Sequence, residues 1–88
     1  MGVTANFTGL IQRTSDEFIR DNIYMIDKTM LAKALKNIDS KLQDKVFRNM
    51  VSASAADVKQ IMANLGDVSI ESVEAAQQEI ITLAAQVV

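Results

Sequence analysis

Apolar residues recur at helical spacing along most of the chain. The clearest stripe, made of Val58, Ile61, Met62 and Leu65, matches the i, i+3, i+4, i+7 pattern of an amphipathic helix. Gly66 follows this stripe, at the position where helices commonly end in a residue with positive φ. The chain has no proline and only three glycines, so nothing punctuates a series of short strands. The pattern therefore predicts an all-α fold.

Similar stripes predict six short amphipathic helices. They cover about residues 5–13, 16–25, 41–51, 55–65 and 70–86, with a further helix that begins directly after Asp27. The last helix presents an apolar face with a glutamine in its middle, made of Ile70, Val73, Gln77, Ile80, Leu83, Ala84 and Val87. Short links favour a compact bundle of five to six helices. We divide the chain into a lead-in with one short helix, residues 1–14, and a helical bundle, residues 15–88.

Capping residues predict where the helices begin. In a capping box, a hydroxyl accepts a hydrogen bond from the N3 amide while the N3 side chain reaches back to the cap. Three pairs have this spacing, namely Thr14 with Glu17, Ser40 with Gln43 and, more weakly, Ser54 with Asp57. Asp27 is a suitable N-cap by itself.

The composition excludes most catalytic chemistry. With no Cys and no His, the chain lacks thiol nucleophiles, the usual general base and the commonest metal ligand. We therefore expect a protein that is not an enzyme and holds no cofactor. The longest apolar runs fall far below the roughly 18 residues of a membrane span, and a net charge of −2 is not typical of a nucleic-acid-binding domain. We expect a cytoplasmic protein with no direct membrane insertion and no nucleic-acid partner.

The charge is unevenly distributed along the chain. Residues 1–60 hold all 9 basic residues, whereas residues 61–88 hold acidic residues and no basic one. Five of the basic residues form a candidate basic face, namely Lys33, Lys36, Lys41, Lys45 and Arg48. Such a face is either an ordinary solvated helix surface or an electrostatic docking surface for a protein partner.

Two other features have a chemical and a structural interpretation. Glu71 and Glu74 have the i, i+3 spacing of carboxylate-bridged metal sites, but no His completes such a site, and both carboxylates complement the positive end of a helix. Ser40 at a helix start invites comparison with acyl carrier proteins, although Lys41 and the basic residues after it replace the acidic helix of those carriers. We expect Ser40 to be an N-cap.

Three blocks of sequence resemble a known family. They are L-A-K-A-L-K at residues 31–36, K-V-F-R-N-M at residues 45–50 and V-E-A-A-Q-Q-E-I at residues 73–80. In this order and spacing they resemble the C-terminal domain of the flagellar motor switch protein FliG, over about residues 16–86. The resemblance implies a rotor bundle at the cytoplasmic face of the flagellar basal body. In that family a charged ridge engages the cytoplasmic loop of the stator protein MotA.

The resemblance places the family's charged ridge at five positions of this chain. Lys36 carries the family's charge at the first of them. The other four positions lack it, and they are Ala53, Gln60, Ile61 and Ser69. We expect Ile61 to be turned toward the core, because it also belongs to an apolar stripe.

Two functions remain open at this point. The first is a flagellar rotor module that docks a stator loop or a switch-complex protein through the basic face around Lys36. The second is a paralogue that uses the same bundle as a scaffold or regulatory module outside torque generation. The apolar pair Val87-Val88 either completes the core or leaves an edge for self-association.

Overall fold

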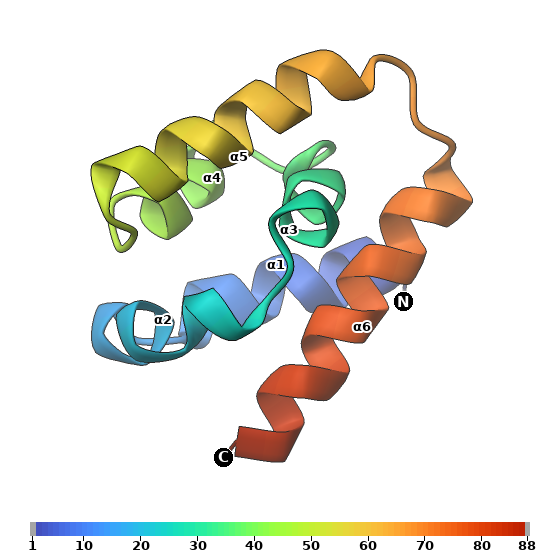
Figure 1. The fold of residues 1–88 in the computed structure, drawn as a ribbon. Coiled ribbons are helices and arrows are strands. Elements are labelled where there is room, and N and C mark those ends of the chain that lie inside the picture. Colours follow the sequence, from blue (N-terminus) through green and yellow to red (C-terminus); the bar gives the residue numbers. More distant parts are fainter. Residues whose placement is uncertain (1, 88) are drawn as a thin grey trace.

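The fold is helical throughout the part of the chain that the computed structural model describes, residues 2–87 (Figure 1). Its elements are α1 (Val3–Arg13), α2 (Asp16–Asn22), the 3₁₀ turn η1 (Ile23–Met25), α3 (Lys28–Leu35), α4 (Ser40–Phe47), α5 (Ser52–Leu65) and α6 (Ile70–Val87). No strand occurs between residues 2 and 87. The predicted fold class is confirmed, while the question raised by Val88 lies outside the described residues.

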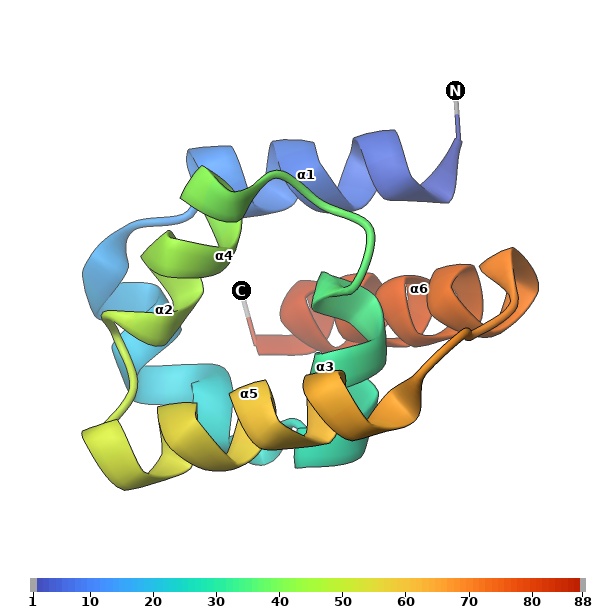
Figure 2. The ribbon, with the colours of Figure 1, turned by 90° about the horizontal axis from the view of Figure 1, so that it is seen from above.

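Helix α3 is the central element of the bundle. It packs against both α5 and α6, while α1 packs against α6 and α4. Seen from above, α1 and α5 lie on opposite sides of the molecule with α3 and α6 between them (Figure 2). Ala32 and Ala34 on α3 are completely buried, and their small side chains leave room for the neighbouring helices to approach closely.

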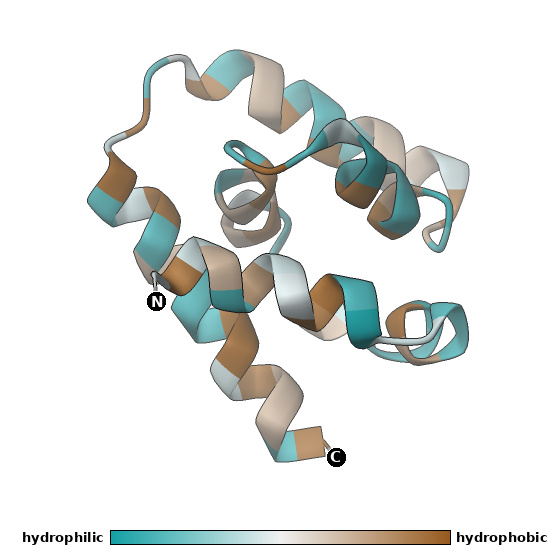
Figure 3. Cartoon of the chain, turned by 180° about the vertical axis from the view of Figure 1, so that it is seen from behind, coloured by the Kyte–Doolittle hydropathy of each residue, from teal (hydrophilic) through white to brown (hydrophobic). Residues whose placement is uncertain are grey.

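Each helix buries one face against this centre. The most deeply buried large apolar side chains are Phe7, Leu35 and Val58, which come from α1, α3 and α5. Hydrophobic and hydrophilic segments alternate along the helices, as expected for amphipathic helices around a shared core (Figure 3). Ile61 is half-buried and packs against this core, as its place in the apolar stripe predicts.

One polar side chain lies within this core. Gln77 is 0% exposed, and its Nε2 donates to the carbonyl oxygen of Ala34 at 2.9 Å and to Oδ1 of Asn37 at 2.8 Å. Its Oε1 accepts from the hydroxyl of Thr4 at 2.7 Å, and that hydroxyl accepts from Nδ2 of Asn37 at 3.3 Å. The contacts join α1, the end of α3 and the middle of α6. They explain why a glutamine occupies the apolar face of the last helix, since a buried amide needs such partners.

Two predicted N-caps are wrong by one residue. Helix α2 is capped by Ser15, whose hydroxyl accepts from the Phe18 amide at 3.1 Å, whereas the Thr14 hydroxyl donates back to α1. Helix α4 is capped by Asp39, whose carboxylate accepts from the Lys41 amide at 3.0 Å. In both places two adjacent residues can cap, and the one that directly precedes the first helical residue does so, although Thr14 has the same extended backbone as Ser15.

The third predicted capping box is wrong as well. Helix α5 begins at Ser52 after Val51, which has no side chain that can cap. The Val51 amide instead donates to the hydroxyl of Tyr24 at 2.7 Å, and Asp57 pairs with Lys28 at 2.7 Å. The other two expected helix ends are confirmed, since Asp27 caps α3 and Gly66 ends α5 with φ of 61°.

Helix α4 ends earlier than the predicted residue 51. Its last helical residue is Phe47, and the following amides of Asn49 and Met50 donate to carbonyls three residues back. The buried Asn49 side chain also donates to the Lys45 carbonyl at 2.8 Å. These tighter turns satisfy the last carbonyls of α4 and end the helix. None of the helices in residues 2–87 is long and apolar enough to cross a membrane.

The corrected cap of α4 can be tested by paired substitutions. We expect Asp39→Ala to lower the free energy of unfolding by about 1 kcal/mol, because the Lys41 amide loses its acceptor. We expect Ser40→Ala to change it by less than about 0.5 kcal/mol, since Ser40 is already inside the helix. Urea denaturation followed by circular dichroism measures both, and an equal or larger loss for Ser40→Ala would show that Ser40 is the cap.

Candidate docking surface

Three residues of the basic face carry charges that have neither an ionic partner nor a side-chain hydrogen bond among the described residues. Lys33 and Lys36 lie one turn apart at the end of α3 and are half-buried, while Lys41 is exposed in the first turn of α4. None of the three forms an ion pair with another residue between 2 and 87. We refer to Lys33, Lys36 and Lys41 as the free lysines.

Lys33 lines a groove between two helices. The groove has a volume of about 340 Å³ and separates the N-terminal part of α3 from the first half of α6. Glu79 lies on its α6 wall, and Met30, Ala75 and Ala76 supply apolar surface. Lys33 is therefore the residue of the basic face that the structure places at a concave surface.

Lys45 contributes to the structure of the domain. Its ammonium donates to the carbonyl oxygen of Ile11 at 2.8 Å and to that of Gln12 at 3.3 Å. These are carbonyls in the last turn of α1, where helices present unpaired acceptors and a partial negative charge. The side chain therefore ties α4 to the end of α1.

Arg48 is also engaged within the bundle. Its Nη2 lies 3.3 Å from Oδ1 of Asp16, and both side chains are about half exposed, which makes the pair a solvent-screened surface ion pair. The same carboxylate oxygen accepts from Nδ2 of Asn49 at 3.1 Å. Arg20 donates to Oδ1 of Asn49 at 3.4 Å. The buried Asn49 side chain therefore lies between Arg20 and Asp16.

This cluster lowers the pKa of Asp16. The main cause is the hydrogen bond from Asn49. Desolvation, the second-largest cause, raises the pKa, and the nearby charges of Arg48 and Lys45 lower it further. Sequence patterns do not reveal the burial of Asn49, because an exposed and a buried asparagine look alike in a sequence. Its place next to Phe47 and Met50 in the apolar stripe of α4 is the one signal that could have indicated burial.

Four positions of the family ridge carry neutral side chains. Ala53 and Gln60 are exposed on α5. Ser69 is exposed just before α6, and its hydroxyl accepts from the Ser72 amide at 3.2 Å. Thus the structure brings Lys36 together with Lys33 on α3, whereas Ala53 and Gln60 lie on a different helix.

Ser40 lies on a different helix from the carboxylates of Glu71 and Glu74. Ser40 is the exposed first residue of α4, Glu71 is exposed, and Glu74 is half-buried on α6. Between residues 2 and 87 no group of three His, Cys, Asp or Glu side chains could hold a metal ion.

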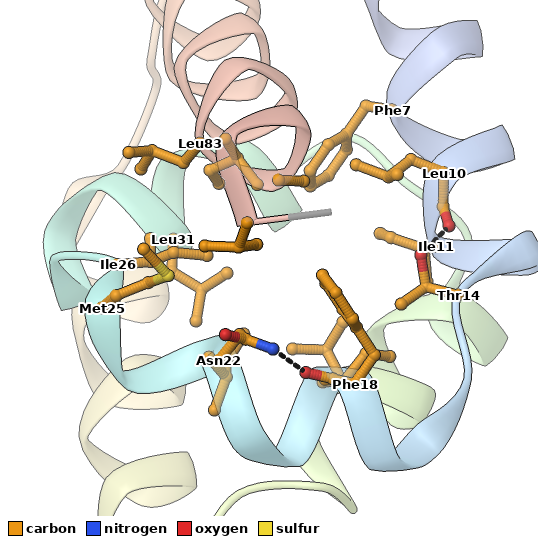
Figure 4. A pocket seen from close by; sticks show the side chains of 16 residues that line it. Phe7, Leu10, Ile11, Thr14, Phe18, Asn22, Met25, Ile26, Leu31 and Leu83 are labelled. Atoms are coloured by element: carbon orange, nitrogen blue, oxygen red, sulfur yellow. Dashed lines mark hydrogen bonds between the residues drawn. The ribbon is translucent and has the colours of Figure 1, made fainter.

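An apolar cavity of about 80 Å³ lies between α1, α2, η1 and the second half of α6 (Figure 4). Phe18 enters it from α2, Leu83 lies on the α6 side, and Thr14 and Asn22 are the two polar residues of its lining. Asn22 uses its amide to donate to the Phe18 carbonyl at 3.0 Å. The lining carries no charged side chain, so the cavity supplies no catalytic group.

The fold and its surface define a small helical bundle with several cations that have no ionic partner in the part described. Residues 5–88 match the family described as the FliG C-terminal domain. This chain therefore belongs to the FliG C-terminal domain family of the flagellar motor switch.

Curated relatives agree with this assignment. The chain is 40% identical over 68 residues to the flagellar motor switch protein FliG of Borreliella burgdorferi, which covers 77% of this chain and 20% of that protein. It is 36% identical over 73 residues to FliG of Thermotoga maritima, covering 83% and 22%. It is 32% identical over 78 residues to FliG of Vibrio cholerae, covering 89% and 22%. The chain thus spans about a fifth of the length of these relatives.

The structural role of Lys45 can be tested against a neighbouring lysine. We expect Lys45→Met to lower the free energy of unfolding by about 1–3 kcal/mol, because a charged donor leaves two carbonyls at the end of α1. Lys41→Met is the matched control and should change it by less than about 0.5 kcal/mol. Thermal and urea denaturation measure both variants. Equal effects would contradict the assignment of Lys45 to the structure.

The lowered pKa of Asp16 predicts a pH dependence of stability. Between the folded and the unfolded pKa, the unfolded chain binds more protons at this site, so stability rises with pH. The contribution is fully present well above the usual aspartate pKa of about 3.9 and is lost as pH falls through the folded value. We expect Asp16→Asn to make the melting temperature fall less steeply below about pH 4.5 than in the wild type. An unchanged acid limb would contradict this account.

Proposed function

We propose that this domain is a non-enzymatic docking module of the flagellar motor switch, at the cytoplasmic face of the basal body. It binds an acidic segment of a protein partner, either a MotA-like stator loop or a switch-complex protein, through the basic face. The observation that carries the proposal is that Lys33, Lys36 and Lys41 have no ionic partner among residues 2–87, while Lys45 and Arg48 are engaged within the bundle. Within the basic face, the free lysines are therefore the contact residues.

Charges at the protein surface act mainly on the rate and the selectivity of such a contact. An exposed lysine keeps its hydration until a partner arrives, so it raises the rate of encounter and selects the partner more than it adds affinity. At physiological ionic strength its effect extends only about 8 Å. A partner must therefore present its acidic residues close to the end of α3 and the start of α4.

A second candidate function is supported by the family ridge positions. Four of them carry no charge, and two of these four contribute to the fold. Ile61 packs on the core, and the Ser69 hydroxyl accepts from the Ser72 amide. The outer face of α5 therefore offers little charge at Ala53 and Gln60 for a ridge-type contact. This supports a FliG-like paralogue that acts as a scaffold or regulatory module outside torque generation.

Binding to a MotA cytoplasmic-loop peptide tests the docking surface. We expect Lys36→Glu to weaken binding at least about fivefold at low salt, because one attractive charge becomes repulsive. Lys59→Glu is the control, since it makes the same charge change on α5, where Lys59 lies over the Phe47 ring at 5.0 Å. Fluorescence anisotropy with a labelled peptide measures the dissociation constant. If Lys59→Glu weakens binding and Lys36→Glu does not, the proposed surface is wrong.

Deletion of the gene distinguishes the two functions. A paralysed or rotation-locked strain is expected for a torque-generating rotor module. Intact swimming and intact reversal are expected for a paralogue with a scaffold or regulatory role. Tracking of single cells and of tethered cells measures both properties.

A further inference from the structure

Three polar side chains meet where α1, α3 and α6 come together. They are Thr4 in the first turn of α1, Asn37 just after α3 and Gln77 in the middle of α6. We propose that these side chains form a latch, which couples the docking of α1 to the conformation of the α3–α4 link, residues 36–39. Because the link carries Lys36, the inference deepens the proposed function and rests on it for its biological meaning. Its test needs no partner, so it can fail separately.

The latch is a closed ring of hydrogen bonds. Gln77 donates to Asn37 and accepts from Thr4, and Asn37 donates to Thr4. The second N–H of Gln77 goes to the Ala34 carbonyl in the last turn of α3. Both donors of the buried amide are therefore used, and no buried side-chain polar atom in the described residues is left unsatisfied. Bonds in such a ring polarise one another, so the loss of one weakens the others.

Undocking of α1 would break the hydrogen bond between Thr4 and Gln77 in this ring. Gln77 is 0% exposed while α1 is docked, so the Thr4 hydroxyl is the partner that its Oε1 would lose when α1 moves away. The glutamine would then reorient toward another donor and release Asn37 or the Ala34 carbonyl. The end of α3 would keep its apolar packing and the bond from the Gln43 side chain to the Leu35 carbonyl at 2.6 Å, but not its polar tie to α1.

The coupling runs in both directions. Any contact that holds Asn37 and Lys36 in their present positions favours the docked state of α1, because binding free energies between two sites are reciprocal. A partner on the free lysines would therefore fasten α1, and displacement of α1 would loosen the lysine-bearing link. Thr4, Asn37 and Gln77 are positioning residues in this scheme, since none of them needs to touch the partner.

Amide hydrogen exchange of the full chain tests the first direction. Thr4→Val removes the hydroxyl and keeps the shape of the side chain. We expect it to lower the protection of the Lys36 amide, which donates to Lys33 at 3.2 Å, by about tenfold, while the Val58 amide in α5 changes less than about twofold. Thr8→Val is the matched control, because the Thr8 hydroxyl donates within α1 to Ala5 at 3.0 Å. A uniform loss of protection, or an unchanged Lys36 amide, overturns the latch.

Asn37→Ala tests the reverse direction. We expect this change to lower the protection of the Asn6 amide in α1, which donates to Gly2 at 3.2 Å, although Asn37 is not part of that helix. Asn64→Ala, on the exposed face of α5, is the control and should leave the Asn6 amide unchanged. If Asn37→Ala loosens only the α3–α4 link, the three side chains are separate structural contacts and the latch is wrong.

Discussion

The carboxamide of Gln77 has to satisfy its hydrogen-bonding groups inside an apolar core, and the arrangement of three helices follows from that constraint. Its donors meet the end of α3 and its acceptor meets the first turn of α1. Apolar packing alone would allow α1 to slide or rotate on α6, because dispersion and hydrophobic contacts have little directionality. Hydrogen bonds from a buried amide do have direction, so they select one position of α1.

The polar residues of the bundle fall into two groups with different consequences. Thr4, Gln77, Lys45 and Asn49 use polar atoms for hydrogen bonds to segments far apart in the sequence. The free lysines at the end of α3 and the start of α4 remain available to a partner. The same composition that excludes catalysis by histidine or cysteine thus leaves charge as the main chemistry at the surface. This division is consistent with a domain that acts by docking.

The sequence predicts the helices well and their contacts poorly. Helical periodicity is local, so the stripe that ends at Gly66 was identified together with its C-cap. N-caps were missed where Thr14 stands beside Ser15 and Ser40 beside Asp39, because two adjacent residues can both cap and the sequence does not show at which of them the helix begins. The basic face was predicted as one surface of five residues.

The roles of the residues in the basic face depend on contacts between helices, which local sequence patterns do not show. Lys45 reaches the end of α1, more than thirty residues away in the sequence, and Arg48 reaches Asp16. The burial of Asn49 likewise depends on α2 and its cations. Such pairings follow from the packing of helices, so a reading of one helix at a time assigns these side chains to the surface. The family resemblance assigns Lys36 to the charged ridge from the sequence blocks alone, and this assignment stays a prediction.

The central claim is that a protein partner docks on the free lysines at the end of α3 and the start of α4. Titration of isotope-labelled protein with a MotA cytoplasmic-loop peptide, followed by amide chemical shifts, tests it most directly. The account predicts the largest shifts at residues 33–41, with smaller ones in the first turn of α1 through Thr4. Shifts concentrated on the outer face of α5, around Ala53 and Gln60, would contradict it.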